Sequence, residues 1–472
     1  MRSSACFTTA LASTALVLLA LPQAGHAAPC SFGIDPLAPT VTCGAPDSDP
    51  VSSAQDGLAV VVTSTGSVTS TNRNTPPLAL GGTTVSVVND GIIDNSDTRN
   101  NTDAIQATGS GLTIVNSGKI SSGDRAIHAL DGFGGGLVVT NLADGEITSR
   151  RQTIRTEGSA PGSVVTNYGT ISSLEGRALQ LRGQGTSVTN YGTLIGGEEV
   201  IEARDDFSLV NYGSIKIRDG VEDQDGVQFA SGTVLNHGLI QGSDDGIDID
   251  EGTITNTATG RIITTGSGGN GIDIDPEFDN SRDPLRPSGT VTIINAGYIE
   301  GPSAIGTDPA AQNRVEVYNS GTLVGRDSPA IALAPMQGDS LVSLSRDSQV
   351  FGDILFGGGN DVLEIKALSA GFLFDGQADG GAGQNTLRLT DYLLADIASF
   401  SLVDGVVQFA LTSVAGETLG RFVNFDTWLL GDGTRYATRD LAAQFAPVPL
   451  PAGLPLMLAA LGGLALLRRR TA

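Results

Sequence analysis

An internal repeat of about 24 residues constrains the fold of this 472-residue chain more than any other sequence feature. Each copy has an Asn followed by a Gly, two residues later in eight copies and four residues later in two. One interval, from Asn256 to Asn295, is longer at 39 residues. A unit this short cannot bury its apolar side chains alone, so the copies must stack. The ten Asn residues are Asn89, Asn116, Asn141, Asn167, Asn190, Asn211, Asn236, Asn256, Asn295 and Asn319.

The apolar residues keep the same frame in every copy. The positions two before the Asn and two after the Gly hold Val, Ile or Leu in all ten copies, and a third apolar position follows 8 to 14 residues after the Gly. Short β-branched runs of this kind predict strands with one buried face. The pattern therefore predicts an all-β fold, a parallel β-helix solenoid of ten or more coils. We expect it to be right-handed, by analogy with coils of this length.

The Asn and the Gly mark the corner between two strands. Both residue types tolerate positive φ, and we expect the bend to use that conformation. Stacked Asn amides can also hydrogen-bond along the axis of a stack, so we expect an Asn ladder.

The N-terminal segment is predicted to be a targeting signal. Residues 1–27 contain Arg2, an apolar run of about a dozen residues and a small residue at each end of Gly25-His26-Ala27. This order is typical of a secretory signal peptide, with cleavage after Ala27.

The C-terminal segment, residues 447–472, contains a Pro-rich motif, an apolar span and a basic cluster in that order. An apolar span that ends in cations stops in a membrane with the charges on the cytoplasmic side. The motif is Val448, Pro449, Leu450, Pro451 and Ala452, and the basic cluster is Arg468, Arg469 and Arg470.

This segment resembles the VPLPA class of sorting tails, close to the PEP-CTERM tails of Gram-negative bacteria. The resemblance implies an exosortase-type processing enzyme as a partner and transient anchoring in the inner membrane. It also implies removal of the span and delivery to the cell surface or the medium. A plain C-terminal membrane anchor is the alternative. Removal of both ends takes away four Arg and no acidic residue, so the formal charge changes from −24 to −28.

Composition limits the partners. The chain has 51 Asp and Glu against 27 Lys and Arg, and so acidic a protein is not expected to bind nucleic acid. Of the three Cys, Cys6 leaves with the signal peptide, which leaves Cys30 and Cys43. Export to an oxidising compartment predicts a disulfide between these two.

We divide the chain into five segments. Between the signal peptide and the sorting tail lie an N-terminal cap with the Cys pair at 28–80, the β-helix repeats at 81–335, and the last Gly-rich turns with a C-terminal cap at 336–446. The repeat pattern over about 81–390 resembles the passenger domains of bacterial autotransporters and related surface β-helix proteins. Residues 276–289 contain three Pro, at 276, 284 and 287, and predict an insertion loop.

The densest acidic sequence lies in two successive copies, where Asp245 to Asp250 aligns with Asn270 to Asp275. If the Ile residues face inward, Asp248 lies over Asp273 and Asp250 lies over Asp275, preceded by Asp223, Asp225 and Gln228. Three interpretations are open. The first is a solvated acidic face. The second is Ca²⁺ bound between coils by Asp248, Asp250, Asp273 and Asp275. The third is a set of catalytic carboxylates acting on polysaccharide.

The catalytic interpretation has partial support. Asp244 and Asp245 resemble a carboxylate pair of pectinase-type β-helix enzymes, but the His and Arg-x-Lys signatures of that family are missing. A lyase would need a cationic base, and Arg282 and Arg286 in the insertion are the only local candidates.

Two further patterns have alternative interpretations. Phe356 to Leu363 and Gly380 to Leu387 resemble the calcium-binding nonapeptides of repeats-in-toxin proteins, which makes Asp361 a second Ca²⁺ candidate; they also fit the last turns of a solenoid. A column of outward-facing aromatic rings is expected either to serve as a sugar-binding platform or to stiffen the corner by stacking. It consists of Tyr168, Tyr191, Tyr212 and His237.

These patterns require no cofactor, and Ca²⁺ is the one candidate ion. We predict a non-enzymatic, structural or adhesin-like protein of the cell surface or extracellular matrix, with extracellular polysaccharide as the candidate ligand. The alternative is a polysaccharide lyase or glycoside hydrolase that uses the Asp248 and Asp273 region.

Overall fold

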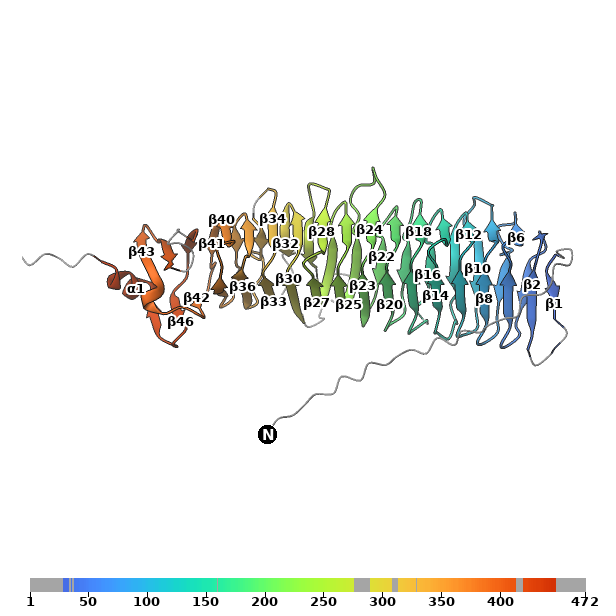
Figure 1. The fold of residues 1–472 in the computed structure, drawn as a ribbon, viewed down its shortest axis with the longest axis horizontal. Coiled ribbons are helices and arrows are strands. Elements are labelled where there is room, and N and C mark those ends of the chain that lie inside the picture. Colours follow the sequence, from blue (N-terminus) through green and yellow to red (C-terminus); the bar gives the residue numbers. More distant parts are fainter. Residues whose placement is uncertain are drawn as a thin grey trace, which may run out of the picture.

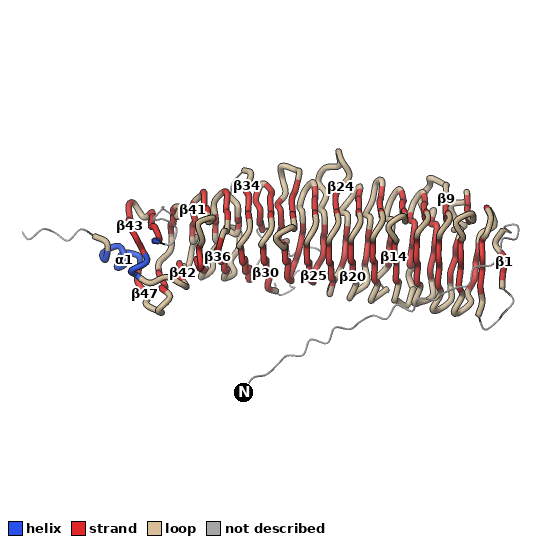
Figure 2. Tube along the Cα trace, in the orientation of Figure 1, coloured by secondary structure: helices blue, strands red, loops and turns tan. Residues whose placement is uncertain are grey.

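The computed structural model describes residues 29–446 apart from 34, 36–37, 159, 276–288, 308–312, 328 and 413–418. It confirms the predicted parallel β-solenoid, with about 13 turns stacked into an elongated body (Figure 1). Strands and connecting loops make up the stack, and the short α-helix lies at its C-terminal end (Figure 2). The predicted signal peptide, the sorting motif and the Arg cluster lie outside the described residues.

Each turn has three strand positions. In one turn they are β11 (Thr113–Asn116), β12 (Lys119–Ser122) and β13 (Arg125–Ala129), and each pairs in parallel with its counterparts in the neighbouring turns. The second strands form a 14-stranded sheet, and the first and third strands belong to a 33-stranded sheet. In two turns the third strand continues into the first strand of the next turn, so β25 (Val227–Asn236) and β27 (Ile247–Asn256) are each ten residues long.

The remaining strands follow the same order. The first position also holds β2 (Thr40–Cys43), β5 (Ala59–Val62), β8 (Ser86–Asn89), β14 (Val138–Asn141), β17 (Val164–Asn167), β20 (Ser187–Asn190), β23 (Phe207–Asn211), β30 (Thr290–Asn295), β33 (Arg314–Asn319), β36 (Ser340–Arg346), β39 (Val362–Leu368), β42 (Thr386–Leu389) and β46 (Thr427–Leu430). The second also holds β3 (Pro46–Asp47), β6 (Ser67–Ser70), β9 (Ile92–Asn95), β15 (Glu146–Ser149), β18 (Thr170–Ser173), β21 (Thr193–Gly196), β24 (Ser214–Ile217), β26 (Leu239–Gly242), β28 (Arg261–Thr264), β31 (Tyr298–Gly301), β34 (Thr322–Gly325), β37 (Gln349–Phe351) and β40 (Leu373–Asp375). The third also holds β4 (Val51–Ser53), β7 (Leu78–Leu80), β10 (Asp103–Ala107), β16 (Ile154–Thr156), β19 (Leu179–Leu181), β22 (Ile201–Ala203), β29 (Asn270–Ile274), β32 (Ser303–Thr307), β35 (Ile331–Ala332), β38 (Ile354–Leu355), β41 (Gln377–Asp379) and β45 (Arg421–Val423).

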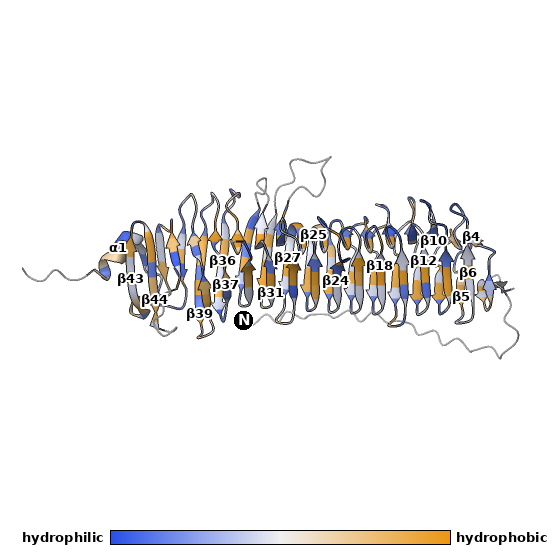
Figure 3. Ribbon diagram, turned by 90° about the horizontal axis from the view of Figure 1, so that it is seen from above, coloured by the Kyte–Doolittle hydropathy of each residue, from blue (hydrophilic) through white to orange (hydrophobic). Residues whose placement is uncertain are grey.

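The core is a set of aliphatic columns inside the stack. All three predicted apolar positions are buried, and in the third strands Ile127, Ile247 and Ile272 have no exposed surface. Apolar and polar residues alternate along the strands (Figure 3), because successive side chains of a strand point to opposite faces. The period-2 pattern of the sequence thus fixes which side chains enter the core.

The predicted Asn ladder is confirmed. Each Asn from Asn89 to Asn295 donates its Nδ2 hydrogen to the Oδ1 atom of the Asn in the next turn, at 2.7 to 2.9 Å. The ladder ends where Asn319 donates to Ser348 Oγ. These side chains are at most 1% exposed. A buried amide is costly unless it is hydrogen-bonded, and here each amide is bonded to its own counterpart.

The corner Gly residues are explained by close approach and not by positive φ, which corrects the prediction. None of the ten repeat glycines is among the residues with positive φ. Instead, a Cβ atom at Gly192 or Gly213 would lie 2.1 Å from the carbonyl oxygen of the corner Gly in the preceding turn. Only Gly allows the backbones of successive corners to come this close.

The stack begins earlier than the predicted boundary at residue 81. β2 already pairs in parallel with β5, and β5 pairs with β8. In these turns Cys43 and Val62 occupy the position of the ladder Asn, so a search for Asn and Gly does not find them.

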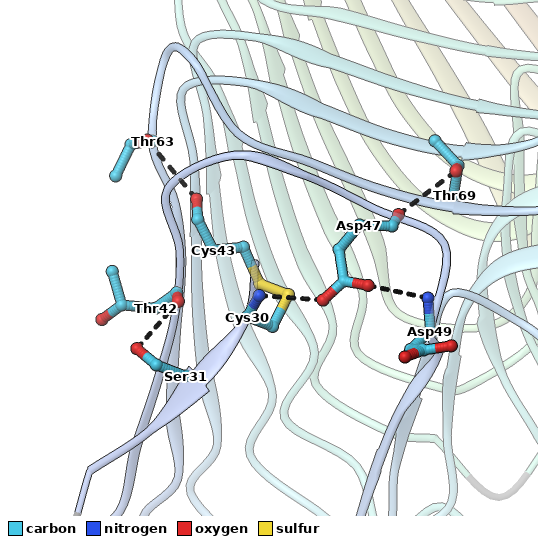
Figure 4. The surroundings of a disulfide bond; sticks show 8 residues. All are labelled: Cys30, Ser31, Thr42, Cys43, Asp47, Asp49, Thr63 and Thr69. Atoms are coloured by element: carbon cyan, nitrogen blue, oxygen red, sulfur yellow. Dashed lines mark hydrogen bonds between the residues drawn. A yellow bond between two sulfur atoms is a disulfide. The ribbon is translucent and has the colours of Figure 1, made fainter. Parts of the chain in front are cut away.

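The ends of the stack are closed by different structures. At the N-terminal end β1 (Ser31–Phe32) runs antiparallel to β2, and a disulfide joins Cys30 to Cys43 (Figure 4). The Cys30 N–H also donates to Asp47 Oδ2 at 2.8 Å. At the C-terminal end lie the 3-10 helix η1 (Leu394–Asp396), β43 (Ile397–Val403), β44 (Val406–Leu411), β47 (Arg435–Ala437) and α1 (Thr438–Gln444).

Antiparallel pairing and aromatic packing close the C-terminal end. β43 pairs with β44, and β46 pairs with β47. Trp428 is fully buried between Phe400 and Phe409, with ring centroids 5.0 Å apart in both contacts. Covering the last turn removes an open sheet edge that would otherwise pair with another chain.

The Asn ladder yields a stability prediction. Replacing Asn211 by Ala removes the hydrogen bonds to Asn190 and Asn236, and we expect a loss of about 2 kcal/mol of unfolding free energy. Because turns of a solenoid contact only their neighbours, hydrogen exchange should rise mainly in the adjoining turns. Ser208→Ala on the same strand, at a half-buried position, is the control and should change stability little. Equal losses in the two variants would contradict a stabilising role for the ladder.

Candidate functional site

A row of polar side chains runs along the third strands, one residue after the inward-facing aliphatic position. We call it the polar row. Successive members are register partners on adjacent strands. Its members are Gln106, His128, Arg155, Gln180, Glu202, Gln228, Asp248 and Asp273.

In the N-terminal part of the polar row each acidic group has a cationic or amide partner. The two His128 ring nitrogens lie 2.9 Å from Asp103 Oδ2 and 3.2 Å from Glu157 Oε1. Arg155 Nε donates to the same Glu157 oxygen at 2.7 Å. Glu202 accepts a hydrogen bond from Gln180 at 2.7 Å and lies 2.6 Å from the Arg177 guanidinium. This part of the row is therefore a network of neutralised charges.

In the next turns the described residues supply amide and backbone hydrogen bonds but no cation. Asp225, Asp244, Asp245 and Asp248, which we call the acidic group, have no salt bridge among the described residues. One carboxylate oxygen from each of Asp225, Asp244 and Asp245 lies within 4.8 Å of the others. At this separation two unit charges repel by about 3 kcal/mol at an effective dielectric constant of about 20.

The corner between the second and third strands brings these carboxylates together. Asp245 donates its backbone N–H to Asp225 Oδ1 at 3.0 Å, and Asn270 donates its N–H to Asp245 Oδ1. Each Asp thus caps the backbone of the following turn, which stacks the carboxylates along the axis. Asp248 lies on the adjoining strand, where its Oδ2 accepts from Gln228 at 2.8 Å and its buried Oδ1 has no hydrogen-bond partner among the described residues.

Burial dominates the electrostatics of the acidic group. Removal from water raises the pKa of Asp225 to about 7 and that of Asp245 to about 9, and neighbouring carboxylates add to both shifts. Burial likewise raises the pKa of Asp248 well above its usual range, and the charges acting on it include those of Asp225, Asp245 and Asp273. The same carboxylates therefore raise the pKa of Asp248 as well.

The predicted pairing of Asp248 with Asp273 is confirmed by their register, whereas the pairing of strands ends at Ile249 and Ile274, before Asp250 and Asp275. Asp248 and Asp250 are each only 7% exposed, so the interpretation as a solvated acidic face is wrong for these two residues. Arg282 and Arg286 lie outside the described residues.

Asp361 is in a different environment. It is fully buried at the corner before β39, where its Oδ1 accepts the Ser340 N–H at 2.7 Å and its own N–H donates to Asn385 Oδ1 at 2.9 Å. Burial raises its pKa to about 6. The turns of β32 and β35 separate it from the acidic group. Asp361 serves as a corner cap in the described structure.

The outward aromatic column is a continuous stack. Ring centroids from Tyr168 to Tyr191, Tyr212 and His237 are 4.6 to 4.9 Å apart, and adjacent rings are within 2° of parallel. A sugar stacks on a ring face, but the faces here are covered by the neighbouring rings. The geometry therefore favours stiffening of the corner over a sugar platform.

The sequence pattern missed the role of Asp225 and Asp245 as the centre of the site. Both lie two residues before the inward aliphatic residue. The prediction instead used the acidic positions that follow this residue on the strand. The detectable signal was the recurrence of Asp at that corner position, 20 residues apart.

The chain matches no protein-family model, no curated protein and no solved structure. Among the described residues, no helix is long and apolar enough to cross a membrane. Its function is therefore inferred from its own residues.

The raised pKa values predict the pH dependence of the metal-free protein. Between about pH 4 and pH 7 the native state holds protons on Asp225 and Asp245 that the unfolded state has lost, because an unfolded Asp titrates near about 3.9. Stability should therefore fall as the pH rises through this interval. In EDTA, Asp245→Asn should flatten this slope and raise the melting temperature at pH 8, since Asn keeps the acceptor for the Asn270 N–H. Lower stability of the variant at pH 8 would contradict the assignment.

Proposed function

We propose that the protein is an exported, non-enzymatic structural or adhesin-like β-solenoid of the cell surface or extracellular matrix. The observation that carries the proposal is the continuous parallel stack from β2 to β46, closed at both ends. Such a stack is a rod of roughly 70 Å, since the strands from β2 to β46 repeat at about 4.8 Å. A closed rod presents long rows of side chains without a tendency to pair through its ends.

Two features support export. The first is the Cys30–Cys43 disulfide, because disulfides persist in an oxidising compartment and are rare in the cytosol. The resemblance of the C-terminal segment to exosortase-dependent sorting tails adds a route to the surface. Extracellular polysaccharide is the candidate ligand class for the rod.

Processing and location test this proposal together. We expect the exported protein to lack residues 1–27 and the residues after about Ala452, which intact-mass measurement would show. Antibodies should label intact, unpermeabilised cells or their matrix. Labelling only after permeabilisation would contradict export. Exported protein that retains Arg468 to Arg470 would contradict the processing step and indicate a plain anchor.

A polysaccharide-active enzyme is the second candidate, because buried carboxyls with raised pKa values are suited to general acid catalysis. The missing His and Arg-x-Lys signatures of pectinase-type enzymes argue against it. Glycoside hydrolases hold their two carboxyls about 5–5.5 Å apart when retaining and about 6.5–9.5 Å apart when inverting. One oxygen from each of Asp225, Asp244 and Asp245 lies within 4.8 Å of the others, so the carboxyls of this group crowd one another.

Cleavage assays separate the two candidates. The exported protein should release no reducing ends or unsaturated products from uronic-acid polysaccharides. Activity that disappears in Asp248→Ala and Asp273→Ala but persists in Asp361→Asn would replace the structural proposal by an enzymatic one.

A further inference from the structure

We propose that the acidic group is a binding site for one hard divalent cation, with Ca²⁺ as the ion it suits best. The donors are the carboxylates of Asp225, Asp244 and Asp245 together with Oδ1 of Asp248. This set differs from the four residues that the sequence pattern indicated, because it is centred on the corner before β27 and not on the strand pair β27 and β29.

The first argument is geometric. Three carboxylate oxygens from two successive turns lie within 4.8 Å of one another. A cation in contact with all of them at Ca²⁺–oxygen distances of about 2.3–2.6 Å fits between oxygens with that separation. The backbone fixes the positions, because the N–H groups of Asp245 and Asn270 hold one oxygen each of Asp225 and Asp245. Two of the donors are therefore held in place by the backbone before an ion binds.

The second argument is the unsatisfied oxygen of Asp248. This residue is 7% exposed, its Oδ2 is bonded to Gln228, and its Oδ1 has no hydrogen-bond partner among the described residues. A buried carboxylate oxygen without a partner is costly, and a bound cation would remove that cost. Asp248 follows Asp245 by three residues in the same turn, and the charges of Asp225 and Asp245 act on it.

The third argument comes from comparison within the polar row. In the N-terminal turns Arg155 and Arg177 neutralise Glu157 and Glu202. In the turns of β25 and β27 the described residues supply no such cation to the acidic group. All the donors are oxygen atoms, which favours Ca²⁺ over metals that prefer nitrogen or sulfur. Mg²⁺ requires a tight octahedron and gives up its water reluctantly, so it should bind more weakly.

Calorimetric titration of the EDTA-stripped full chain with CaCl₂ tests the proposal directly. We expect one ion bound per chain and a rise in melting temperature of about 2–5 °C in millimolar Ca²⁺. The reference is NaCl at matched ionic strength, because screening of a chain with formal charge −24 also stabilises. Hydrogen exchange should slow around β25 and β27 and stay unchanged around β11 and β12.

The variants separate this site from other acidic residues. The double variant Asp225→Asn and Asp245→Asn keeps both backbone acceptors and should lose the Ca²⁺-specific shift. Asp361→Asn is the matched control, because Asp361 is also a buried corner cap, and it should keep the full shift. A shift retained by the double variant would overturn the proposal and place the ion elsewhere.

Two other outcomes would also overturn the proposal. If Ca²⁺ does no more than matched NaCl, the acidic group holds protons and not a cation. If the double variant and Asp361→Asn lose the Ca²⁺-induced shift in melting temperature equally, the shift reflects the net charge of the chain and not a specific site. Each variant is judged by its own Ca²⁺-induced shift, so a change in its intrinsic stability does not affect the comparison.

Discussion

The stacking of equivalent positions at about 4.8 Å is the constraint on which the rest of this structure depends. In such a stack the nearest neighbour of a side chain is its own counterpart in the next turn. A residue type can therefore repeat only if it is complementary to itself. Ile and Val meet this condition by packing, and Asn meets it because one amide both donates and accepts. The ladder from Asn89 to Asn319 is the direct result.

Charged residues do not meet this condition, and the polar row shows how the chain responds. Its members change from turn to turn, so that Gln180 lies against Glu202 and Gln228 lies against Asp248. Only at Asp248 and Asp273 do two acids follow one another in register. With Asp225 and Asp245 at the adjoining corner, carboxylates accumulate around the buried Asp248. The raised pKa values express the same imbalance, since each charge there is opposed by burial and by its neighbours.

Much of the fold could be predicted from the sequence, because the period, the apolar positions and the Asn ladder are properties of each repeat. The register of Asp248 and Asp273 followed from the same frame. The first turns were missed because Cys43 and Val62 replace the ladder Asn. The reason for Gly at the corner was predicted wrongly, because contact between the backbones of different turns leaves no signal in the local sequence.

The convergence of Asp225 and Asp245 could not be predicted for a related reason. The connection from the corner Gly to the third strand varies from 8 to 14 residues, so spacing alone does not say which corner residues stack. That alignment is set by the hydrogen bond from the Asp245 N–H to Asp225, which belongs to the folded structure. The pairing of adjacent strands can be predicted from the repeat alone. The alignment of the corner residues depends on how two turns pack together.

The place of the acidic group in the stack gives it mechanical importance. Stability in a solenoid is approximately a sum of turns and of the interfaces between neighbours. The ends of a stack are the usual sites of fraying. Here they are closed by a disulfide and by the aromatic packing around Trp428. The interface between β25, β27 and β29 carries repulsion that no other described part of the polar row carries. Neutralisation of these carboxylates therefore adds stability to an interface that nine register pairs between β25 and β27 already hold together.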